Sequence, residues 1–274
     1  MTTAILGSQT KLSINGTVYE FQSCGIDKLG SPVIFRDGIT GTIDTASTDA
    51  RNGPCHVGGP VSLQPSCAQI LALSTLAVAA ANGTLTEFDM VVDRGYNVIT
   101  YEDCKVNSLT LRGGQGGIFD LSLDIIGKTA NTTGTVAAAT ITAPAIFADC
   151  VLTLGNAAYE VMSIDMAVNN GLRSDRYANS LALTDIPMGG KRSVTLQTVH
   201  AHTGTISNTL WNTTATALSA TNSLTINDGT SAVTFTFGAL TAPRTDPPID
   251  QGEVLLTKNW IATKTAAAAA IAVA

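Results

Sequence analysis

The sequence predicts a mainly β protein with two tandem domains, each built from about six or seven strands and one short α-helix. Only 13% of the residues are charged, and Thr, Ser, Asn, Gly and Ala are abundant instead. Thr favours strands, whereas Gly and Asn favour the turns between strands. A strand–turn–helix pattern at Val57–Ala80 also returns in outline at Met188–Trp211. A repeated central unit predicts a tandem duplication.

The first expected element is a β-hairpin over Lys11–Phe21. Its Asn15-Gly16 pair is a strong signal for a two-residue turn, and apolar residues alternate on both sides of it. The same pattern recurs at Val151–Val161, where Tyr159-Glu160 matches Tyr19-Glu20 at a constant offset. We therefore expect each half to begin with this hairpin.

A long polar stretch follows the hairpin in each half, at residues 36–55 and again at 169–187. Both stretches are rich in Gly, Asp, Thr, Asn and Ser and have few apolar anchors. Excursions of this length are usually functional or without fixed structure. One interpretation is a protruding hairpin that contacts a neighbouring subunit, and the alternative is a floppy loop.

The repeated unit itself begins with a half-buried strand in which Val57, Val61 and Leu63 alternate with small or polar residues. Ser66 is a plausible N-cap for a short amphipathic helix that runs to about Val78. In the second half we align Gly189-Gly190 with Gly58-Gly59, and Leu196-Gln197 with Leu63-Gln64. This alignment predicts a second helix that begins at His200–His202.

Alternating strands complete each half, and the ends IIGKTA (125–130) and IATKTA (261–266) match closely. The glycine-rich segment at 113–117 lacks the spacing of a dinucleotide-binding fingerprint, so we interpret it as a turn between strands. A small, polar, Pro-containing stretch separates the repeats and reads as a linker. The expected domains are residues 1–130 and 147–274, with a linker at 131–146.

Charge and cysteine content restrict the function. The net charge is −6 and the basic residues are scattered, which argues against a dedicated DNA-binding role. The low charge suggests a surface largely covered by other subunits, although exposed Thr-rich strands alone would give the same composition. Five cysteines without a C-x-x-C pair indicate neither a disulfide framework nor a zinc site. The sequence shows no signal peptide and no apolar run of membrane-spanning length, so we expect no membrane partner.

The search for chemistry predicts neither an enzyme nor a cofactor. His200 and His202 could share one strand face, but no third metal ligand lies nearby in the sequence. Asp44, Asp49, Asp120 and Asp124 are better explained as solvated charges than as a general acid and base. No catalytic or nucleotide-binding motif occurs.

The order of polar loop, VGG-x-V-x-L-x-P-S, amphipathic helix and long alternating strands resembles the tail tube proteins of long-tailed bacteriophages. The resemblance covers most of both halves and is sharpest at Gly58–Leu76. The second half departs from the pattern, because Lys191-Arg192 replaces Pro60 and no proline follows Gln197.

The resemblance implies β-sandwich or half-barrel tube domains, each flanked by one helix, whose inner sheets join into a continuous barrel. It implies a pseudo-hexameric ring of three subunits, rings stacked through long loops, and a tube that passes double-stranded DNA without binding it specifically. The partners would be further copies of the chain and other phage tail proteins. The chain would belong to the tail of the virion and assemble in the cytoplasm of the host bacterium.

Two sets of residues follow as expected sites. Three chains of charge −6 would carry −18 per ring. Acidic residues in the lumen would repel the phosphate groups of DNA and prevent them from binding. The acidic residues expected in the lumen are Asp89, Asp120 and Asp124. The residues expected in ring-stacking loops are Thr40, Thr42, Asp44, Asp49, Arg51, Arg173, Asp175 and Arg176. The alternatives are another phage structural part (a tail terminator, a decoration protein or a secretion-type tube) and a carbohydrate-binding or hydrolytic β-sandwich.

Overall fold

The structure is a computed structural model that describes residues 10–29, 33–35, 50–78, 84–132, 134–201, 218, 221–243, 255–265 and 268–274. Strands β1 to β20 dominate these residues, which contain one α-helix. The prediction of a mainly β protein is therefore confirmed.

The helices and strands of the described residues fall into two halves of the chain. The first half contains β1 (Lys11–Ile14), β2 (Thr17–Tyr19), β3 (Ser23–Cys24), β4 (Asp27–Leu29), β5 (Val33–Phe35), β6 (Ala50–Asn52), β7 (His56–Leu63), α1 (Cys67–Ala77), β8 (Phe88–Asp93), β9 (Val98–Gly114), β10 (Asp120–Gly127) and β11 (Thr129–Asn131). The second half contains the 3-10 helix η3 (Phe147–Asp149), β12 (Cys150–Leu154), β13 (Ala157–Tyr159), β14 (Ser163–Asn169), β15 (Ser193–Ala201), β16 (Asn222–Asn227), β17 (Ala232–Phe237), β18 (Ala239–Thr241), β19 (Leu255–Thr263) and β20 (Ile271–Val273).

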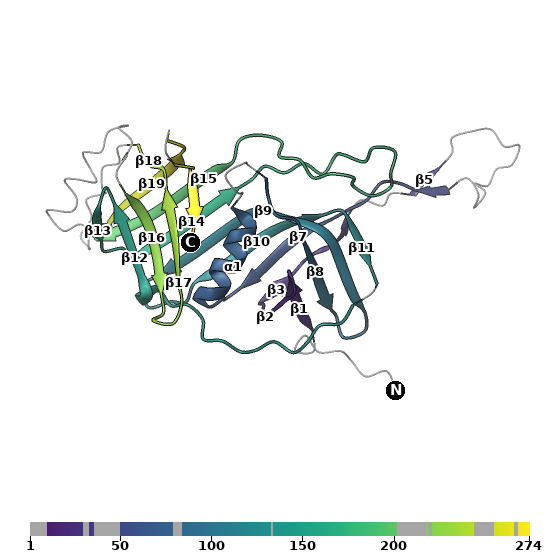
Figure 1. Ribbon diagram of the computed structural model, residues 1–274, viewed down its shortest axis with the longest axis horizontal. Coiled ribbons are helices and arrows are strands. Elements are labelled where there is room, and N and C mark those ends of the chain that lie inside the picture. Colours follow the sequence, from purple (N-terminus) through teal and green to yellow (C-terminus); the bar gives the residue numbers. More distant parts are fainter. Residues whose placement is uncertain are drawn as a thin grey trace, which may run out of the picture.

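One sheet, which we call the spanning sheet, runs through both halves in the order β18–β19–β15–β14–β9–β10–β7–β3, and β4 also pairs with β7. The halves meet where β14 pairs antiparallel with β9, from Asn169 opposite Ser108 to Ser163 opposite Gly114. Figure 1 shows these strands as one layer that extends across the molecule. The junction between the halves is thus a backbone hydrogen-bonded ladder.

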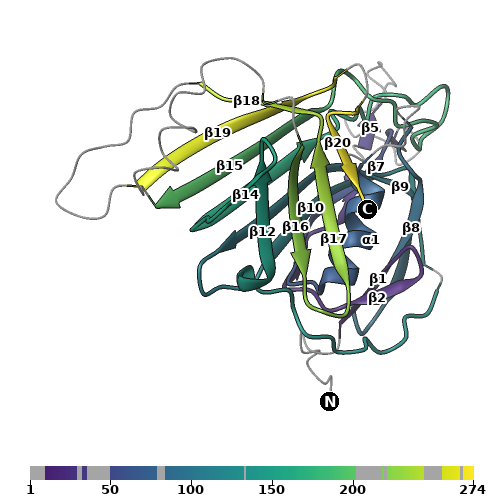
Figure 2. The ribbon, with the colours of Figure 1, turned by 60° about the vertical axis from the view of Figure 1, so that its left-hand side comes forward.

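A second layer packs on one face of the spanning sheet. Its strand order is β2–β1–β8–β9–β11 in the first half and β13–β12–β16–β17–β20 in the second. Figure 2 shows β12, β16 and β17 crossing in front of the spanning sheet, with α1 beside β17. The side chains between the layers form one hydrophobic core that draws on both halves, including Tyr101, Phe235 and Trp260.

Strand β9 belongs to both layers. Its first part pairs with β8 and β11, and its second part pairs with β10 and β14. The change occurs near Asp103, which has a φ of 52°, and the register with β8 shifts beside it, between Phe88 and Met90. Such an irregularity bends a strand and re-aims it. In the second half two strands, β17 and β18, take the corresponding pairings.

The predicted helix in the first half is confirmed as α1. Ser66 Oγ accepts a hydrogen bond from the Gln69 backbone N–H, and the Gln69 side chain accepts one from the Ser66 N–H. This reciprocal capping box satisfies two backbone donors at the start of the helix. The buried face, which includes Ile70 and Leu73, contacts β9 and β17.

The strand pairings correct four details of the sequence alignment. Cys24 and Ile164 are equivalent at the offset that relates Tyr19 to Tyr159. Val61 pairs with Cys24 and Thr198 pairs with Ile164. Leu63 therefore corresponds to His200 rather than to Leu196. Gly189-Gly190 precede β15, whereas Gly58-Gly59 lie inside β7. The second helix cannot begin at His200, because β15 continues to Ala201. The rest of the expected helix lies outside the described residues.

The fourth correction concerns the ends of the two repeats. Ile125 is buried in β10, but Ile261 is 54% exposed in β19. A one-residue slip of a strand moves every side chain to the opposite face, so Ile125 corresponds to the buried Trp260 instead. The match between IIGKTA and IATKTA is out of register by one residue.

The segment between the halves has no helix or strand over the described residues from 134 to 144. In Figure 1 it passes beneath α1 from β11 to β12. It is fixed at its end, where the Ala145 N–H donates to the Pro65 carbonyl and the Ala145 carbonyl accepts from the Phe119 N–H. Its extended course is compatible with a linker between two units.

Candidate assembly surface

The face of the spanning sheet that points away from the core is polar. We call it the open face. Along β10 the buried Leu121, Leu123 and Ile125 alternate with Asp120, Ser122 and Asp124. The same alternation places Thr195 and Gln197 of β15 and Asn259 of β19 on this face. A sheet with one dry and one solvated face has this period-2 pattern.

Hydrogen bonds between neighbouring strands cover the open face. Gln64 Nε2 donates to Asp120 Oδ1 at 2.9 Å, and Asn107 Nδ2 donates to Asp124 Oδ2 at 2.8 Å. In the second half Gln197 Nε2 donates to Asn259 Oδ1 at 2.8 Å. Side-chain amide groups therefore donate hydrogen bonds to the carboxylates of β10 and to the amide of Asn259.

At the junction this face carries an ion pair between Arg112 of β9 and Asp165 of β14 at 2.8 Å. Over 108–112, 120–126 and 163–169 the charged side chains are this pair together with Asp120 and Asp124. The open face around the junction thus carries more negative than positive charge.

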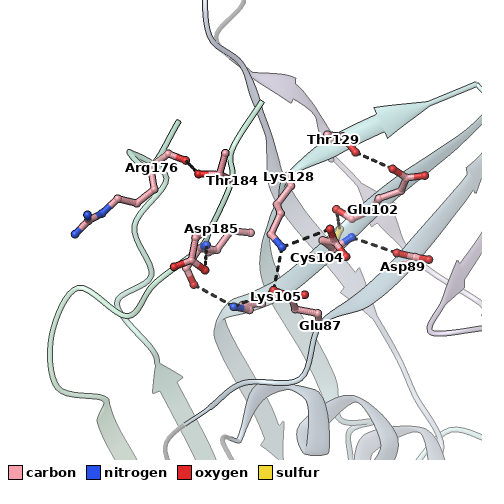
Figure 3. Close-up of polar contacts among 12 residues, drawn as sticks. Glu87, Asp89, Glu102, Cys104, Lys105, Lys128, Thr129, Arg176, Thr184 and Asp185 are labelled. Carbon is pink, nitrogen blue, oxygen red and sulfur yellow. Dashed lines mark hydrogen bonds and ion pairs between the residues drawn. The ribbon is translucent and has the colours of Figure 1, made fainter. Parts of the chain in front are cut away.

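Of the three acidic residues expected in the lumen, the structure brings two together. Asp120 and Asp124 lie on the open face of β10. Asp89 lies on β8 in the second layer, where its Oδ1 accepts a hydrogen bond from the Asp103 N–H (Figure 3). Asp89 therefore does not share a face with the other two.

The polar stretch of the second half is an arm that lies over the first half. We call residues 171–190, between β14 and β15, the second arm. Two isolated antiparallel bridges, Leu172 with Met188 and Arg176 with Asp185, hold its two sides together. Its far end reaches β7, where the Cys55 N–H donates to the Leu181 carbonyl and the Tyr177 hydroxyl lies 3.2 Å from His56 Nδ1.

A charged cluster beneath the second arm holds it in place (Figure 3). Lys105 Nζ donates to the Ile186 carbonyl at 3.2 Å and pairs with Glu87 at the same distance. Lys128 bridges Glu87 and Asp103. Partial burial opposes ionisation of Glu87, but hydrogen bonds from Lys128 and Lys105 outweigh it and lower the pKa of that carboxyl.

Asn170 anchors the start of the second arm. It is fully buried, and its Nδ2 donates to the carbonyls of Ala77 and Val106, each at 2.9 Å. Its Oδ1 accepts from Arg192 Nε. One side chain thus connects the end of α1, strand β9 and the start of β15.

The expected stacking residues are divided between the two polar stretches. Thr40, Thr42, Asp44 and Asp49 lie outside the described residues. Arg51 is exposed on β6. The second arm exposes Arg173, Asp175 and Arg176, and the last two side chains face each other at 3.8 Å.

Two clefts lie at matching places in the two halves. The larger, about 780 Å³, is lined by Tyr159, Glu160 and Met162 among others. The other, about 670 Å³, is lined by Tyr19, Glu20 and Gln22. Each cleft has one carboxylate in its lining, so neither presents the carboxylate pair that the hydrolytic alternative requires.

Of the two histidines, the structure describes His200. His200 is buried in β15, its Nδ1 lies 2.9 Å from the Glu160 carbonyl and its Nε2 lies 2.8 Å from Thr198 Oγ1. His202 lies outside the described residues. The part of the chain that the structure describes holds no group of three or more metal-ligating side chains, and no helix in it has the length and apolar character of a membrane span.

Sequence reasoning missed two features of this surface. The first is Asp165, although the alternation of Ile164, Met166 and Val168 with polar residues marks it as an open-face position. The second is the role of Lys105, which occurs within a strand pattern and has no local motif to indicate that it holds an arm from the other half.

A comparison with protein families identifies a match over most of the chain. The family model described as phage tail tube protein matches residues 12–266, which include both halves of the spanning sheet. No curated protein matched the chain. Because the family model covers nearly the whole sequence, this chain belongs to the phage tail tube protein family and is a structural component of a phage tail.

Proposed function

We propose that three copies of this chain form a ring whose six halves close a β-barrel, and that stacked rings form a tube for double-stranded DNA. The observation that carries this proposal is the pairing of β14 with β9. It joins two halves with the same strand order, β9–β10–β7–β3 and β18–β19–β15–β14. The shared order supports a tandem duplication, with a junction that can be repeated between chains.

The ends of the spanning sheet are suited to such repetition. Among the described residues, β3 and β4 pair within the sheet with β7 alone, while β18 pairs with β19 and forms one bridge to Leu218. Exposed strand edges are a liability that closure into a barrel removes. The position of β3 and β4 in the first half is that of β14 in the second, so this edge would join the next chain.

The size of the resulting barrel suits a DNA duplex. With four strands from each half, a spacing of ~4.8 Å and a tilt of ~45° give a backbone diameter of roughly 50 Å. Side chains would narrow the opening to about 40 Å. This leaves room for a duplex that slides without specific contacts.

The open face would line this lumen. Its hydroxyl and amide groups are uncharged, and Asp120, Asp124 and Asp165 outnumber Arg112. Negative walls repel phosphate groups and give DNA few places to bind. Asp89 lies in the other layer, so the proposed lumen does not include it.

Charge reversal on the open face tests the lumen. Asp120→Lys with Asp124→Lys should leave tubes intact but slow DNA ejection from assembled phage, because six new cations per ring would bind phosphates. The matched control is Asp89→Lys, which should leave ejection unchanged. Equal effects of both variants would exclude the open face as the lumen.

Ring stacking is the remaining part of the proposal. The exposed Asp175 and Arg176 side chains of the second arm would contact the next ring, together with Arg173 and the polar stretch at 36–55. Asp175→Lys combined with Arg176→Glu should yield single rings that do not grow into tubes. The proposed tail is that of a long-tailed phage, with assembly in the host cytoplasm.

Native mass spectrometry of the purified protein tests the ring itself. The expected species has three times the chain mass of 28.2 kDa, and electron microscopy of the same sample should show a central hole. A protein that stays monomeric at high concentration in every salt condition would exclude the proposal.

A further inference from the structure

Strands β5 and β6 form a two-stranded ribbon, which we call the first arm. Val33 pairs with Asn52, and Phe35 pairs with Ala50. Within the described residues these strands pair with each other and with no third strand. Val33 and Ile34 are 52% and 54% exposed. An isolated two-stranded ribbon is marginally stable in water. We therefore expect another protein surface to cover its exposed apolar side chains.

The second arm shows where such a partner lies. The first arm connects β4 with β7, and the second arm connects β14 with β15, which have the same places in the strand order. The second arm leaves the edge strand of its own half and lies on the adjacent half. The backbone bond from Cys55 to Leu181 and the Lys105 bond to the Ile186 carbonyl hold it there.

Figure 1 shows both arms running in the same direction. The second arm runs from the second half toward β7 and β11 of the first. The first arm runs onward in that direction, past the edge of the first half. A second half of another chain, joined at the β3–β4 edge, would lie beneath it.

We infer that the first arm clasps the second half of the neighbouring chain within the same ring, in the way that the second arm clasps the first half of its own chain. This inference rests on the proposed ring. It gives the first arm a lateral role, since its base would hold chains together rather than stack one ring on another.

The strand pairings identify the receiving surface. Val61 and Thr198 are equivalent, and the same shift places Arg192 and Ser193 where Cys55 and His56 receive the second arm. In the second layer Tyr101 pairs with Met90 as Phe237 pairs with Asn222, so these two residues are equivalent. The same shift places Thr241 at the position of Lys105. The expected contact surface is therefore Arg192, Ser193 and Thr241 of the neighbouring chain.

A double substitution on the first arm separates the lateral role from a stacking role. Val33→Asp with Ile34→Asp should abolish rings and leave a monomer with unchanged circular dichroism and melting temperature, because both side chains point into solvent in the free chain. The control is Ile141→Asp, whose side chain is 81% exposed in the segment between the halves, and it should form normal rings.

The other outcomes of this experiment contradict the inference. Single rings that fail to stack would assign the arm to stacking, and normal tubes would give it no part in assembly. A wild-type protein that forms no rings would overturn the proposed ring and this inference with it.

Photocrosslinking keeps the inference testable if the double variant does not fold. With Ile34 replaced by benzoylphenylalanine, irradiated rings should give crosslinked dimers in which the reactive residue joins peptides containing Arg192–Ser193 or Thr241 of the other chain. Crosslinks that appear in stacked tubes but not in single rings would contradict a lateral clasp.

Discussion

Arg112 and Asp165 face each other across the line where the two halves join, with Nε 2.8 Å from Oδ2. The Arg112 side chain is 67% exposed, so water screens the attraction. Exposed ion pairs contribute about 0.2–1 kcal/mol. The junction therefore depends mainly on its backbone ladder and on the buried side chains behind it, such as Met166.

This comparison gives the first prediction. Arg112→Ala should lower the free energy of unfolding by less than about 1 kcal/mol. Met166→Ala, on the opposite face of the same junction, should cost about 2–5 kcal/mol because it leaves a cavity in the core. Urea denaturation of the two variants measures both values. A larger loss for Arg112→Ala than for Met166→Ala would contradict this account of the junction.

Gly59 allows the edge of the spanning sheet to pack closely. Its φ is +149°, and an added Cβ would lie 2.4 Å from the Gly25 carbonyl oxygen. Gly59→Ala should therefore destabilise the protein by at least about 2 kcal/mol through strain and overpacking.

Gly190 supplies the matched control for this substitution. An added Cβ there would meet nothing within 4 Å, so Gly190→Ala should change the melting temperature little. Similar melting temperatures for the two variants would show that the close approach at Gly59 does not limit stability.

Asn170 should be the most sensitive polar residue at the base of the second arm. Asn170→Ala would leave the buried carbonyls of Ala77 and Val106 without their donor, at a cost of about 2–3 kcal/mol. Asn259→Ala, an exposed amide on the open face, should cost less than about 0.5 kcal/mol. Chemical denaturation measures this difference when the unfolding free energy of both variants falls with denaturant concentration at the same slope. Equal stabilities of the two variants would refute the anchoring role.

His200 should make stability depend on pH. Burial lowers the pKa of His200, although its hydrogen bond to the Glu160 carbonyl opposes the shift. Well above pH 6.5 the imidazole is neutral in both the folded and the unfolded chain. As the pH falls below 6.5 the unfolded chain gains a proton that the folded chain does not, so stability decreases.

The measurement compares the free energy of unfolding at pH 7.5 and pH 5.5. His200→Gln should reduce the loss between these two values. His56, whose pKa is also lowered by burial, titrates in the same range, so His56→Gln is the comparison variant and should reduce the loss less. An unchanged pH dependence in His200→Gln would show that another group is responsible.

Local signals predicted the β1–β2 hairpin and the capped helix α1 well. Asn15 and Gly16 both have positive φ, as this type of two-residue turn requires. Ser66 and Gln69 form the capping box within four residues of chain. These features depend on neighbours in the sequence, so residue type and spacing were sufficient to find them.

The alignment of the two halves failed where it matched identical residue types without regard to which face of the sheet each side chain occupies. Lys258 is fully buried in β19, at the position that Leu123 occupies in β10, although a lysine ordinarily marks the solvated face. Strand β9 passes from one layer to the other near Asp103, and the hydrophobic pattern of the sequence does not indicate this change. Both features are fixed by strands that lie far away in the sequence.

The assembly surface was partly predictable for the same reason. Alternation places Asp120 and Asp124 on one face of β10, but strand periodicity does not say which layer contains β8, so the sequence does not separate Asp89 from them. The packing of the second arm on the first half depends on contacts such as His56 with Tyr177, which are 121 positions apart. Single-sequence patterns carry no information about such contacts.

Electron cryomicroscopy of the assembled protein tests the central claim most directly. The account predicts a ring of three chains with six similar lobes, in which β3 and β4 of each chain extend the spanning sheet of the next beyond β18. A ring of six chains, or rings whose sheets end at β3 and β4 without a neighbour, would contradict it.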